Sequence, residues 1–285
     1  MRIFESIIRK QQFSDSDFMQ KKVVVITGAS SGIGRELAMK YAKEGFNLVL
    51  AARRIERLEE LKEKLTNVEV LAVKTDVTSQ EDCKKLIEKA IEKFGTIHIL
   101  INNAGISMRA SIEDVELSVL KKLMDVNYWG TVYCTKFALP YILKERGSIV
   151  GVISTGGYIG LPGRTGYSAS KFAVRGFLDT VRIEYLRAGL HVLVAAPGFT
   201  ASEIRKTALT KNGKQQGETP RNESKMMSAE RCANIMYRAI KNRRRKMIIS
   251  FWDGKFVVLI HKLWAWLIDQ VIYQFFKNEP DSPLK

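Results

Sequence analysis

Short apolar runs alternate with longer amphipathic segments over the first 250 residues of the chain. The runs are rich in Val, Ile and Leu and end at Gly, Pro or charged residues, a pattern typical of strands buried in a parallel sheet. It predicts strands at residues 23–27, 47–52, 68–74, 97–101, 148–154, 191–196 and 247–251. Helical spacing of apolar residues predicts helices at residues 32–44, 55–65, 79–94, 112–144, 165–187 and 226–241, the fourth of them bent.

Strict alternation of strand and helix requires parallel strands joined by right-handed crossovers. The predicted fold class is therefore α/β, a doubly wound parallel sheet (Rossmann fold) of about seven strands with helices on both faces. At 285 residues, 46% of them hydrophobic, the chain suits a single domain with a C-terminal helical appendage. We place an N-terminal extension at residues 1–20, the Rossmann-fold domain at residues 21–250 and an apolar, amphipathic appendage at residues 251–285.

Composition narrows the class of protein further. Glu5, Arg9 and Lys10 interrupt the apolar residues of the extension, so it does not match a signal peptide. No run reaches the roughly 18 apolar residues that cross a bilayer. Three scattered cysteines and three isolated histidines fit neither a disulfide framework nor a metal site. These features favour a reducing, cytoplasmic location and no bound metal.

A glycine-rich turn joins the first predicted strand to the first helix. Its sequence is Thr27-Gly28-Ala29-Ser30-Ser31-Gly32-Ile33-Gly34. Backbone N–H groups and the positive end of a helix hold a pyrophosphate, and glycines let the backbone approach it. The placement between strand and helix favours a nucleotide site over a turn that binds nothing.

The end of the second predicted strand bears on the choice of nucleotide. An acidic residue there would bind the ribose 2′-hydroxyl of NAD, but this chain reads Ala51-Ala52-Arg53-Arg54. Arg53 and Arg54 suit the 2′-phosphate of NADP, although a solvated charge pair at a helix start would look the same. We expect NADP(H) as the cofactor, with an NAD-dependent alcohol dehydrogenase as the alternative.

Tyr167 and Lys171 stand four residues apart, with Ser154 thirteen residues before Tyr167. With the glycine-rich turn, they resemble the classical branch of the short-chain dehydrogenase/reductase family over residues 21–250. Residues 102–140 and the Arg-rich end look most like its membrane-associated dehydrogenase/reductase and hydroxysteroid dehydrogenase-like members. The resemblance implies a catalytic tetrad of Asn127, Ser154, Tyr167 and Lys171. It implies that the cofactor is bound by Gly28, Ser30, Ser31, Gly32, Ile33, Gly34, Arg53, Arg54, Asp76, Val77, Asn103, Ala104, Gly105, Tyr167, Lys171, Pro197, Gly198 and Thr200.

The resemblance also implies how the tetrad works. Lys171 shares a helical face with Tyr167 and lowers the pKa of its phenol toward the range useful for acid–base catalysis. Lys171 also binds the nicotinamide ribose, Ser154 stabilises the substrate oxygen, and Asn127 positions a water that links Lys171 to solvent. The implied reaction interconverts a carbonyl and a secondary alcohol, with Tyr167 as general acid/base. The alternative from another class is a nucleotide-binding redox sensor without turnover.

Substrate choice is expected to depend on residues 198–228, a long polar stretch that we interpret as a lid, the alternative being a surface loop without a gating role. An apolar group beside Ser154 is expected to line the pocket, consisting of Tyr158, Ile159, Leu161 and Pro162. Met108 and Arg109 are placed at the mouth of the pocket, where Arg109 is either a surface charge or a contact for an acidic substrate. The expected substrate is a lipophilic small-molecule ketone or alcohol.

The C-terminal tail departs from a minimal member of the family. Five cations stand among residues 241–246, and residues 255–276 form a predicted helix whose apolar arc exceeds half its circumference. That helix is expected either to pack on protein, or to contact an anionic membrane as a peripheral segment. The resemblance to the short-chain dehydrogenase/reductase family implies that the chain forms a homodimer or homotetramer. The net charge of +16 would also suit nucleic acid, but no recognition motif accompanies it, so no nucleic acid is expected.

Overall fold

The computed structural model describes residues 21–219, 226–249, 256–279 and 282–284, so the extension predicted at residues 1–20 lies outside the described residues. Seven parallel strands form one sheet in the order β3-β2-β1-β4-β5-β6-β7. They are β1 (Val23–Thr27), β2 (Asn47–Ala52), β3 (Val70–Lys74), β4 (Ile99–Asn102), β5 (Ser148–Val152), β6 (His191–Ala196) and β7 (Lys246–Ile248). The strand order reverses between β1 and β4, which opens a crevice at the carboxyl ends of these two strands.

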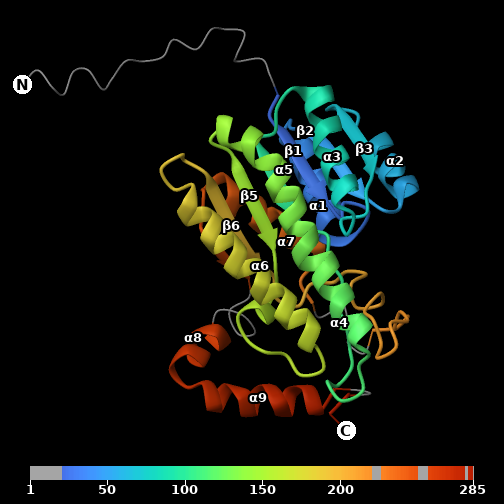
Figure 1. Cartoon of the computed structure of the whole chain (residues 1–285), viewed down its shortest axis with the longest axis vertical. Coiled ribbons are helices and arrows are strands. Elements are labelled where there is room, and N and C mark those ends of the chain that lie inside the picture. Colours follow the sequence, from blue (N-terminus) through green and yellow to red (C-terminus); the bar gives the residue numbers. More distant parts are fainter. Residues whose placement is uncertain (1–20, 220–225, 250–255, 280–281, 285) are drawn as a thin grey trace, which may run out of the picture.

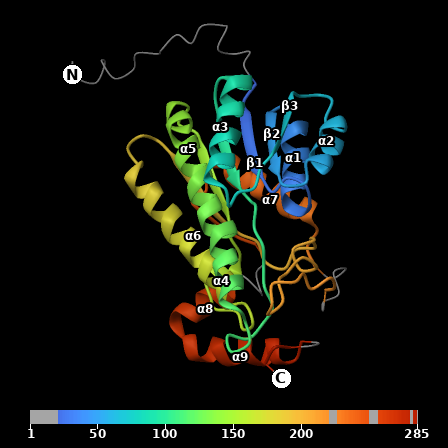
Figure 2. The same ribbon diagram turned by 45° about the vertical axis from the view of Figure 1, so that its right-hand side comes forward.

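Helices cover both faces of the sheet (Figures 1 and 2). One face carries α1 (Gly32–Lys43), α2 (Ile55–Glu63) and α7 (Ala229–Lys241). The other carries α3 (Gln80–Phe94), α5 (Gly130–Lys144) and α6 (Thr165–Glu184). Every residue of β1, β2, β4, β5 and β6 is buried, because both faces of these strands are covered. The predicted doubly wound α/β fold is confirmed.

The bend predicted in the segment 112–144 is a π-helical turn. α4 (Leu117–Met124) continues through this turn (Asp125–Trp129) into α5. Residues 112–116 precede the helix, whereas the sequence placed them inside it. The turn carries Asn127 with its side chain buried, and π-helical turns of this kind are frequent at functional positions.

Other boundaries shift by a few residues. The helix predicted from residue 226 begins at Ala229, because the Ser228 hydroxyl caps it by accepting a hydrogen bond from the Arg231 N–H (3.1 Å). The strand predicted at residues 247–251 is observed as β7, and residues 250–251 lie outside the described residues.

The tail forms two helices where the sequence predicts one. α8 (Phe256–Leu263) and α9 (Ala265–Lys277) are separated at Trp264, whose backbone (φ −139°, ψ 69°) leaves the helical region. Both lie across the end of the molecule where the strands finish (Figure 1). The ring of Phe275 lies 6.2 Å from that of Phe199, which follows β6. Within the described ranges, no helix combines the length and apolar character needed to cross a membrane.

The basic run at residues 241–246 lies at the opposite end of the sheet from α9. Arg243 donates hydrogen bonds to the carbonyl oxygens of Arg146 (3.0 Å) and Gly189 (2.6 Å), which precede β5 and β6. The length of the strands therefore separates the basic run from the apolar helices, which the membrane alternative for the tail would place on one surface.

Candidate active site

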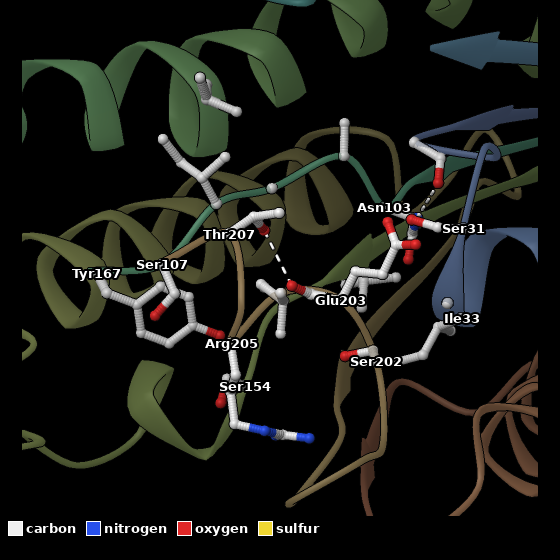
Figure 3. Close-up of a pocket in the computed structure, with 18 of the residues that line it drawn as sticks. Ser31, Ile33, Asn103, Ser107, Ser154, Tyr167, Ser202, Glu203, Arg205 and Thr207 are labelled. Carbon is white, nitrogen blue, oxygen red and sulfur yellow. Dashed lines mark hydrogen bonds between the residues drawn. The ribbon is translucent and has the colours of Figure 1, made fainter. Parts of the chain in front are cut away.

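A cavity of about 450 Å³ opens at the carboxyl ends of the strands. It extends from the glycine-rich turn after β1 to Ser154 and Tyr167 (Figure 3). All residues predicted to bind the cofactor line it except Gly34, namely Gly28, Ser30, Ser31, Gly32, Ile33, Arg53, Arg54, Asp76, Val77, Asn103, Ala104, Gly105, Tyr167, Lys171, Pro197, Gly198 and Thr200. The fold thus brings these distant sequence positions to one surface.

The wall of the cavity at β1 is built largely from backbone. Gly28 has φ +67°, in the left-handed region, and a Cβ there would lie 2.8 Å from Ala104 Cα. Asn103 Nδ2 donates to the carbonyl oxygens of Thr27 (3.0 Å) and Gly28 (3.2 Å). Thr27 Oγ1 accepts from the N–H groups of Asn103 (3.0 Å) and Ala104 (3.1 Å). These contacts hold the turn against the end of β4 and leave a surface of low bulk that fits a pyrophosphate.

Gly34 does not line the cavity but is required by the packing of the turn. A Cβ at Gly34 would overlap the carbonyl oxygen of Gly28 and lie 2.5 Å from Asn103 Nδ2. Helix α1 can therefore approach β1 this closely only with glycine at this position.

The two arginines after β2 take different positions. Arg53 is exposed and lines the cavity. Arg54 Nη2 donates to Ser30 Oγ (3.1 Å) and Ser31 Oγ (3.2 Å) in the glycine-rich turn, and to Glu203 Oε2 (3.2 Å). Positive charge therefore lies at the end of β2, where a doubly wound fold receives the adenosine ribose of a dinucleotide.

Arg54, Arg57 and Glu203 form a charged cluster beside the glycine-rich turn. The sequence did not predict a place in this cluster for Arg57 or Glu203. Arg57 Nη1 donates to both carboxylate oxygens of Glu203 (2.9 and 3.0 Å). Although burial alone would raise it, the hydrogen bonds from Arg57 and Arg54 hold the pKa of Glu203 below its usual value. Arg57 could have been found from its place three residues after Arg54 on one helix face. Glu203 comes from a distant loop and carries no comparable signal.

Ser154, Tyr167 and Lys171 lie together at the other end of the cavity. Ser154 follows β5, and Figure 3 shows its side chain beside the Tyr167 ring. Lys171 is one helical turn beyond Tyr167 on α6, and its Nζ lies 5.8 Å from the centroid of the Tyr167 ring. The same Nζ donates to the carbonyl oxygen of Val152 (2.9 Å). The predicted grouping of these three side chains is thus present.

The effect of Lys171 on the pKa of the Tyr167 phenol stays a prediction, and other groups influence that pKa in this structure. Burial raises the pKa of Tyr167, and this rise is opposed by a hydrogen bond with Ser154 and by the charges of Arg164 and Arg205. Burial also lowers the pKa of Lys171 to about 8. The cations that favour the phenolate are therefore two guanidinium groups that the sequence did not single out for this role.

A hydrogen-bond network holds Asn127 behind Lys171. Asn127 Oδ1 accepts from the Ile106 N–H (2.8 Å), and its Nδ2 donates to the Ile106 carbonyl (3.0 Å) and to Ser170 Oγ (2.8 Å). A Cβ at Gly105 would lie 3.1 Å from Asn127 Oδ1 and 3.2 Å from Lys171 Nζ, so both groups face the same glycine. Asn127 itself does not line the cavity. Ser170 is a buried member of the network that the sequence did not indicate.

The side chain of Arg109 is largely covered and does not line the cavity, which corrects its expected place on the surface or at the pocket mouth. Its Nη2 lies 3.6 Å from Glu279 Oε2, with side chains only 9% and 6% exposed. Burial, together with the charges of Arg109 and Arg205, lowers the pKa of Arg164 to about 10. Its guanidinium lies 5.2 Å from the ring of Phe276 in α9. Charged and aromatic contacts therefore hold the tail against the end of the cavity that carries Ser154 and Tyr167, here called the substrate end.

The apolar lining of the pocket differs from the predicted one. Of the four residues expected beside Ser154, only Leu161 lines the cavity. Tyr158 and Ile159 are buried, Pro162 lies outside the lining, and Met108 packs in a buried cluster with Tyr167. Ile106, Phe199 and Leu209 are among the other apolar residues that line the cavity.

Comparison with known proteins agrees with this geometry. A family profile described as short chain dehydrogenase matches residues 22–213. The chain belongs to the short-chain dehydrogenase family. It is 42% identical to 11-beta-hydroxysteroid dehydrogenase A of Sesamum indicum over 66% of this chain and 55% of that protein, little more than half of the relative's length. It is 36% identical to 11-beta-hydroxysteroid dehydrogenase-like 2 of Arabidopsis thaliana, over 90% of this chain and 82% of that one.

Solved structures of the family superpose on most of this short-chain dehydrogenase. An alcohol dehydrogenase from Thermococcus sibiricus complexed with 5-hydroxy-NADP has a TM-score of 0.71 at 25% identity, covering 80% of this chain and 94% of that chain. A short chain dehydrogenase/reductase from Burkholderia phymatum in complex with NAD has a TM-score of 0.72 at 27% identity, covering 80% and 88%. These structures support a nicotinamide cofactor for the cavity. One of them holds an NADP derivative and the other holds NAD, so they do not distinguish between the two.

Proposed function

We propose that this chain is an NADP(H)-dependent oxidoreductase that interconverts a carbonyl and a secondary alcohol, with Tyr167 as general acid/base. The observation that carries the proposal is the single cavity that joins Arg54 and the glycine-rich turn to Ser154, Tyr167 and Lys171. A bound nicotinamide would supply or accept the hydride. The residues of the chain would then orient the substrate, exclude water and move the proton.

The proton step is assigned to Tyr167 and Ser154. In carbonyl reduction, the phenol of Tyr167 donates its proton to the substrate oxygen while the Ser154 hydroxyl stabilises the developing negative charge. The raised pKa of Tyr167 keeps the phenol protonated at neutral pH, which suits this direction. Lys171 has N–H groups beyond the one bonded to Val152, and these are available for the ribose hydroxyls and for a water beside Asn127.

The preference for NADP over NAD rests on the cations after β2. A guanidinium binds phosphate through paired hydrogen bonds, and Arg54 already bonds Ser30 and Ser31 of the turn. Arg53 adds a second guanidinium at the same cavity wall. The chain offers no carboxylate in the two residues after β2 for the ribose 2′-hydroxyl of NAD. These features support NADP(H).

The proposed substrate is a lipophilic ketone or the corresponding alcohol. Ile106, Leu161, Phe199 and Leu209 line the cavity and offer apolar surface to such a molecule. Relatives are named as 11-beta-hydroxysteroid dehydrogenases, which makes a steroid-like ketone a reasonable first choice.

We also propose residues 21–250 as the catalytic domain and the tail as an appendage that pairs with a second copy of the chain. Several large apolar side chains of α8, α9 and the residue between them are exposed, namely Leu263, Trp264, Trp266, Leu267, Val271, Tyr273 and Phe275. Patches of this kind mark protein or membrane contacts. Because the basic run lies at the other end of the sheet, it adds no charge to this face, and a protein partner is favoured over an anionic membrane.

The test combines nucleotide binding with turnover. We expect purified protein to bind NADPH more tightly than NADH and to oxidise NADPH in the presence of apolar ketones, followed by the absorbance of the reduced nicotinamide. Tyr167→Phe should lower turnover at least about 100-fold while NADPH still binds, because only the proton donor is lost. Undiminished turnover in the variant would disprove the role of Tyr167. NADPH binding without turnover on any ketone would instead support a redox sensor.

A further inference from the structure

Glu203 lies beside the glycine-rich turn, where it pairs with Arg54 and Arg57. We propose that the Glu203 carboxylate is an internal counter-ion that neutralises Arg54 and Arg57 until the 2′-phosphate of NADP(H) takes its place. The inference rests on the proposed use of NADP(H) and goes beyond it, because it assigns a role to an acidic residue outside β2 and to an arginine one turn into α2. Glu203 would thereby set how strongly the chain favours the phosphorylated nucleotide.

The Glu203 carboxylate is held by guanidinium groups, which are also the groups that bind phosphate. Glu203 accepts from Arg57 Nη1 through both oxygens (2.9 and 3.0 Å) and from Arg54 Nη2 through Oε2 (3.2 Å). The same Arg54 nitrogen bonds Ser30 and Ser31. Two guanidinium groups therefore meet beside the glycine-rich turn, where the Glu203 carboxylate from another segment pairs with both of them and two hydroxyls accept from Arg54.

The surroundings favour exchange of the carboxylate for a more highly charged anion. A second hollow next to the turn is lined by four further cationic or acidic side chains besides this cluster, namely Arg35, Lys64, Lys206 and Glu60. A phosphate monoester carries about −1.5 to −2 charges at neutral pH and three acceptor oxygens, against one charge on a carboxylate. The side chains of Arg54, Arg57 and Glu203 are 43%, 42% and 42% exposed, so their pairing is weak and can be broken by a stronger anion.

The segment that carries Glu203 connects the two ends of the cavity. Thr207 donates through both its N–H (3.0 Å) and its Oγ1 (3.0 Å) to the Glu203 carbonyl, and Arg205 Nη2 donates to the Thr200 carbonyl (2.8 Å). Figure 3 shows Glu203 in this turn between Ser31 on one side and Arg205 with the catalytic side chains on the other. Release of Glu203 would therefore free one anchor of the 200–207 turn, which also carries a cation that acts on Tyr167.

The experiment measures binding without relying on catalysis. Glu203→Gln keeps the size of an exposed side chain and removes its charge, so the variant should fold, which circular dichroism checks. Calorimetric titration with NADPH should give a dissociation constant about three- to tenfold lower than that of the wild type, the gain expected when a weak competing ion pair is removed. The constant for NADH should stay within about twofold. Adenosine 2′,5′-bisphosphate, which carries the 2′-phosphate, should likewise bind more tightly to the variant, whereas the dissociation constant of AMP should stay unchanged.

Glu60→Gln is the matched control. Glu60 lines the same hollow, and within the described part of the chain it forms no ion pair with Arg54 or Arg57. It should leave the ratio of the NADPH and NADH constants unchanged. Unchanged NADPH binding in Glu203→Gln would overturn the inference. So would weaker binding of both nucleotides, which would make Glu203 a clamp, or weaker binding of NADH alone, which would make it a ligand of the ribose 2′-hydroxyl. A wild type that does not prefer NADPH would instead refute the proposed cofactor itself.

Discussion

The two ends of the cavity are built differently. At the nucleotide end, the backbone of the turn after β1 packs so closely that a Cβ at Gly28 or Gly34 would collide with its neighbours, and Asn103 ties the turn to β4. At the substrate end, charged side chains from separate segments meet the tail, with Arg109 paired to Glu279. The turn after β1 depends on close backbone packing against the end of β4. The contact with the tail depends on charge pairing between parts of the chain that are distant in sequence.

This difference has consequences for what each end can change. A surface made of backbone N–H groups can bind a pyrophosphate whatever side chains surround it. It therefore suits a cofactor that many members of a family use. A pocket made of side chains and a tail can be altered without disturbing the sheet. Side chains at the substrate end can therefore change without disturbing the backbone packing of the turn.

The largest expected effect is at the substrate end. Arg109→Met should lower the free energy of unfolding by about 3 kcal/mol, because it leaves the buried carboxylate of Glu279 without this partner. Urea unfolding measures the change. Arg187→Met, which removes an exposed arginine, is the control and should change stability by less than about 0.5 kcal/mol. Equal stability of both variants would mean that the charge pair does not hold the tail.

The nucleotide end should respond to a much smaller change in side-chain volume. Gly34→Ala should cost about 2 kcal/mol of folding free energy, because its Cβ would overlap the carbonyl of Gly28. Gly176→Ala is the matched control, since a Cβ there meets nothing within 4 Å and alanine favours a helix. Urea unfolding of the two variants should therefore give changes of opposite sign. A stable Gly34→Ala variant would show that α1 can move away from β1.

The same contrast explains how much could be predicted from the sequence. The strands and the nucleotide wall follow from local patterns, because apolar runs, glycines and their spacing determine them directly. The positions of Arg109, Arg164 and Glu279 do not, because each depends on where the tail packs. The predicted partner of Tyr167 shows the same limit. Spacing correctly placed Lys171 one turn away, but only the fold shows that burial raises the phenol pKa and that guanidinium groups oppose it.

Arg205 offers a way to test whether the substrate end acts on the proton step. Its charge favours the phenolate of Tyr167, so Arg205→Met should raise the pKa of the phenol further. Alcohol oxidation needs the phenolate, so its kcat/KM should begin to rise only at a higher pH than in the wild type. Lys206→Met removes an exposed neighbouring cation and should leave the pH profile in place. Identical profiles for wild type and Arg205→Met would separate the 200–207 turn from the chemistry.

The smallest effect on folding is expected on the outer face of the tail. Trp266 is 69% exposed in the single chain, so Trp266→Ser should change the unfolding free energy of a dilute monomer by less than about 0.5 kcal/mol. Ile268→Ala, at a buried position two residues away, should cost at least about 2 kcal/mol. If a second copy covers this face, Trp266→Ser should nevertheless shift the protein toward monomer in sedimentation velocity. Unchanged sedimentation, together with flotation of the wild type on anionic vesicles and its loss in the variant, would assign the face to a membrane instead.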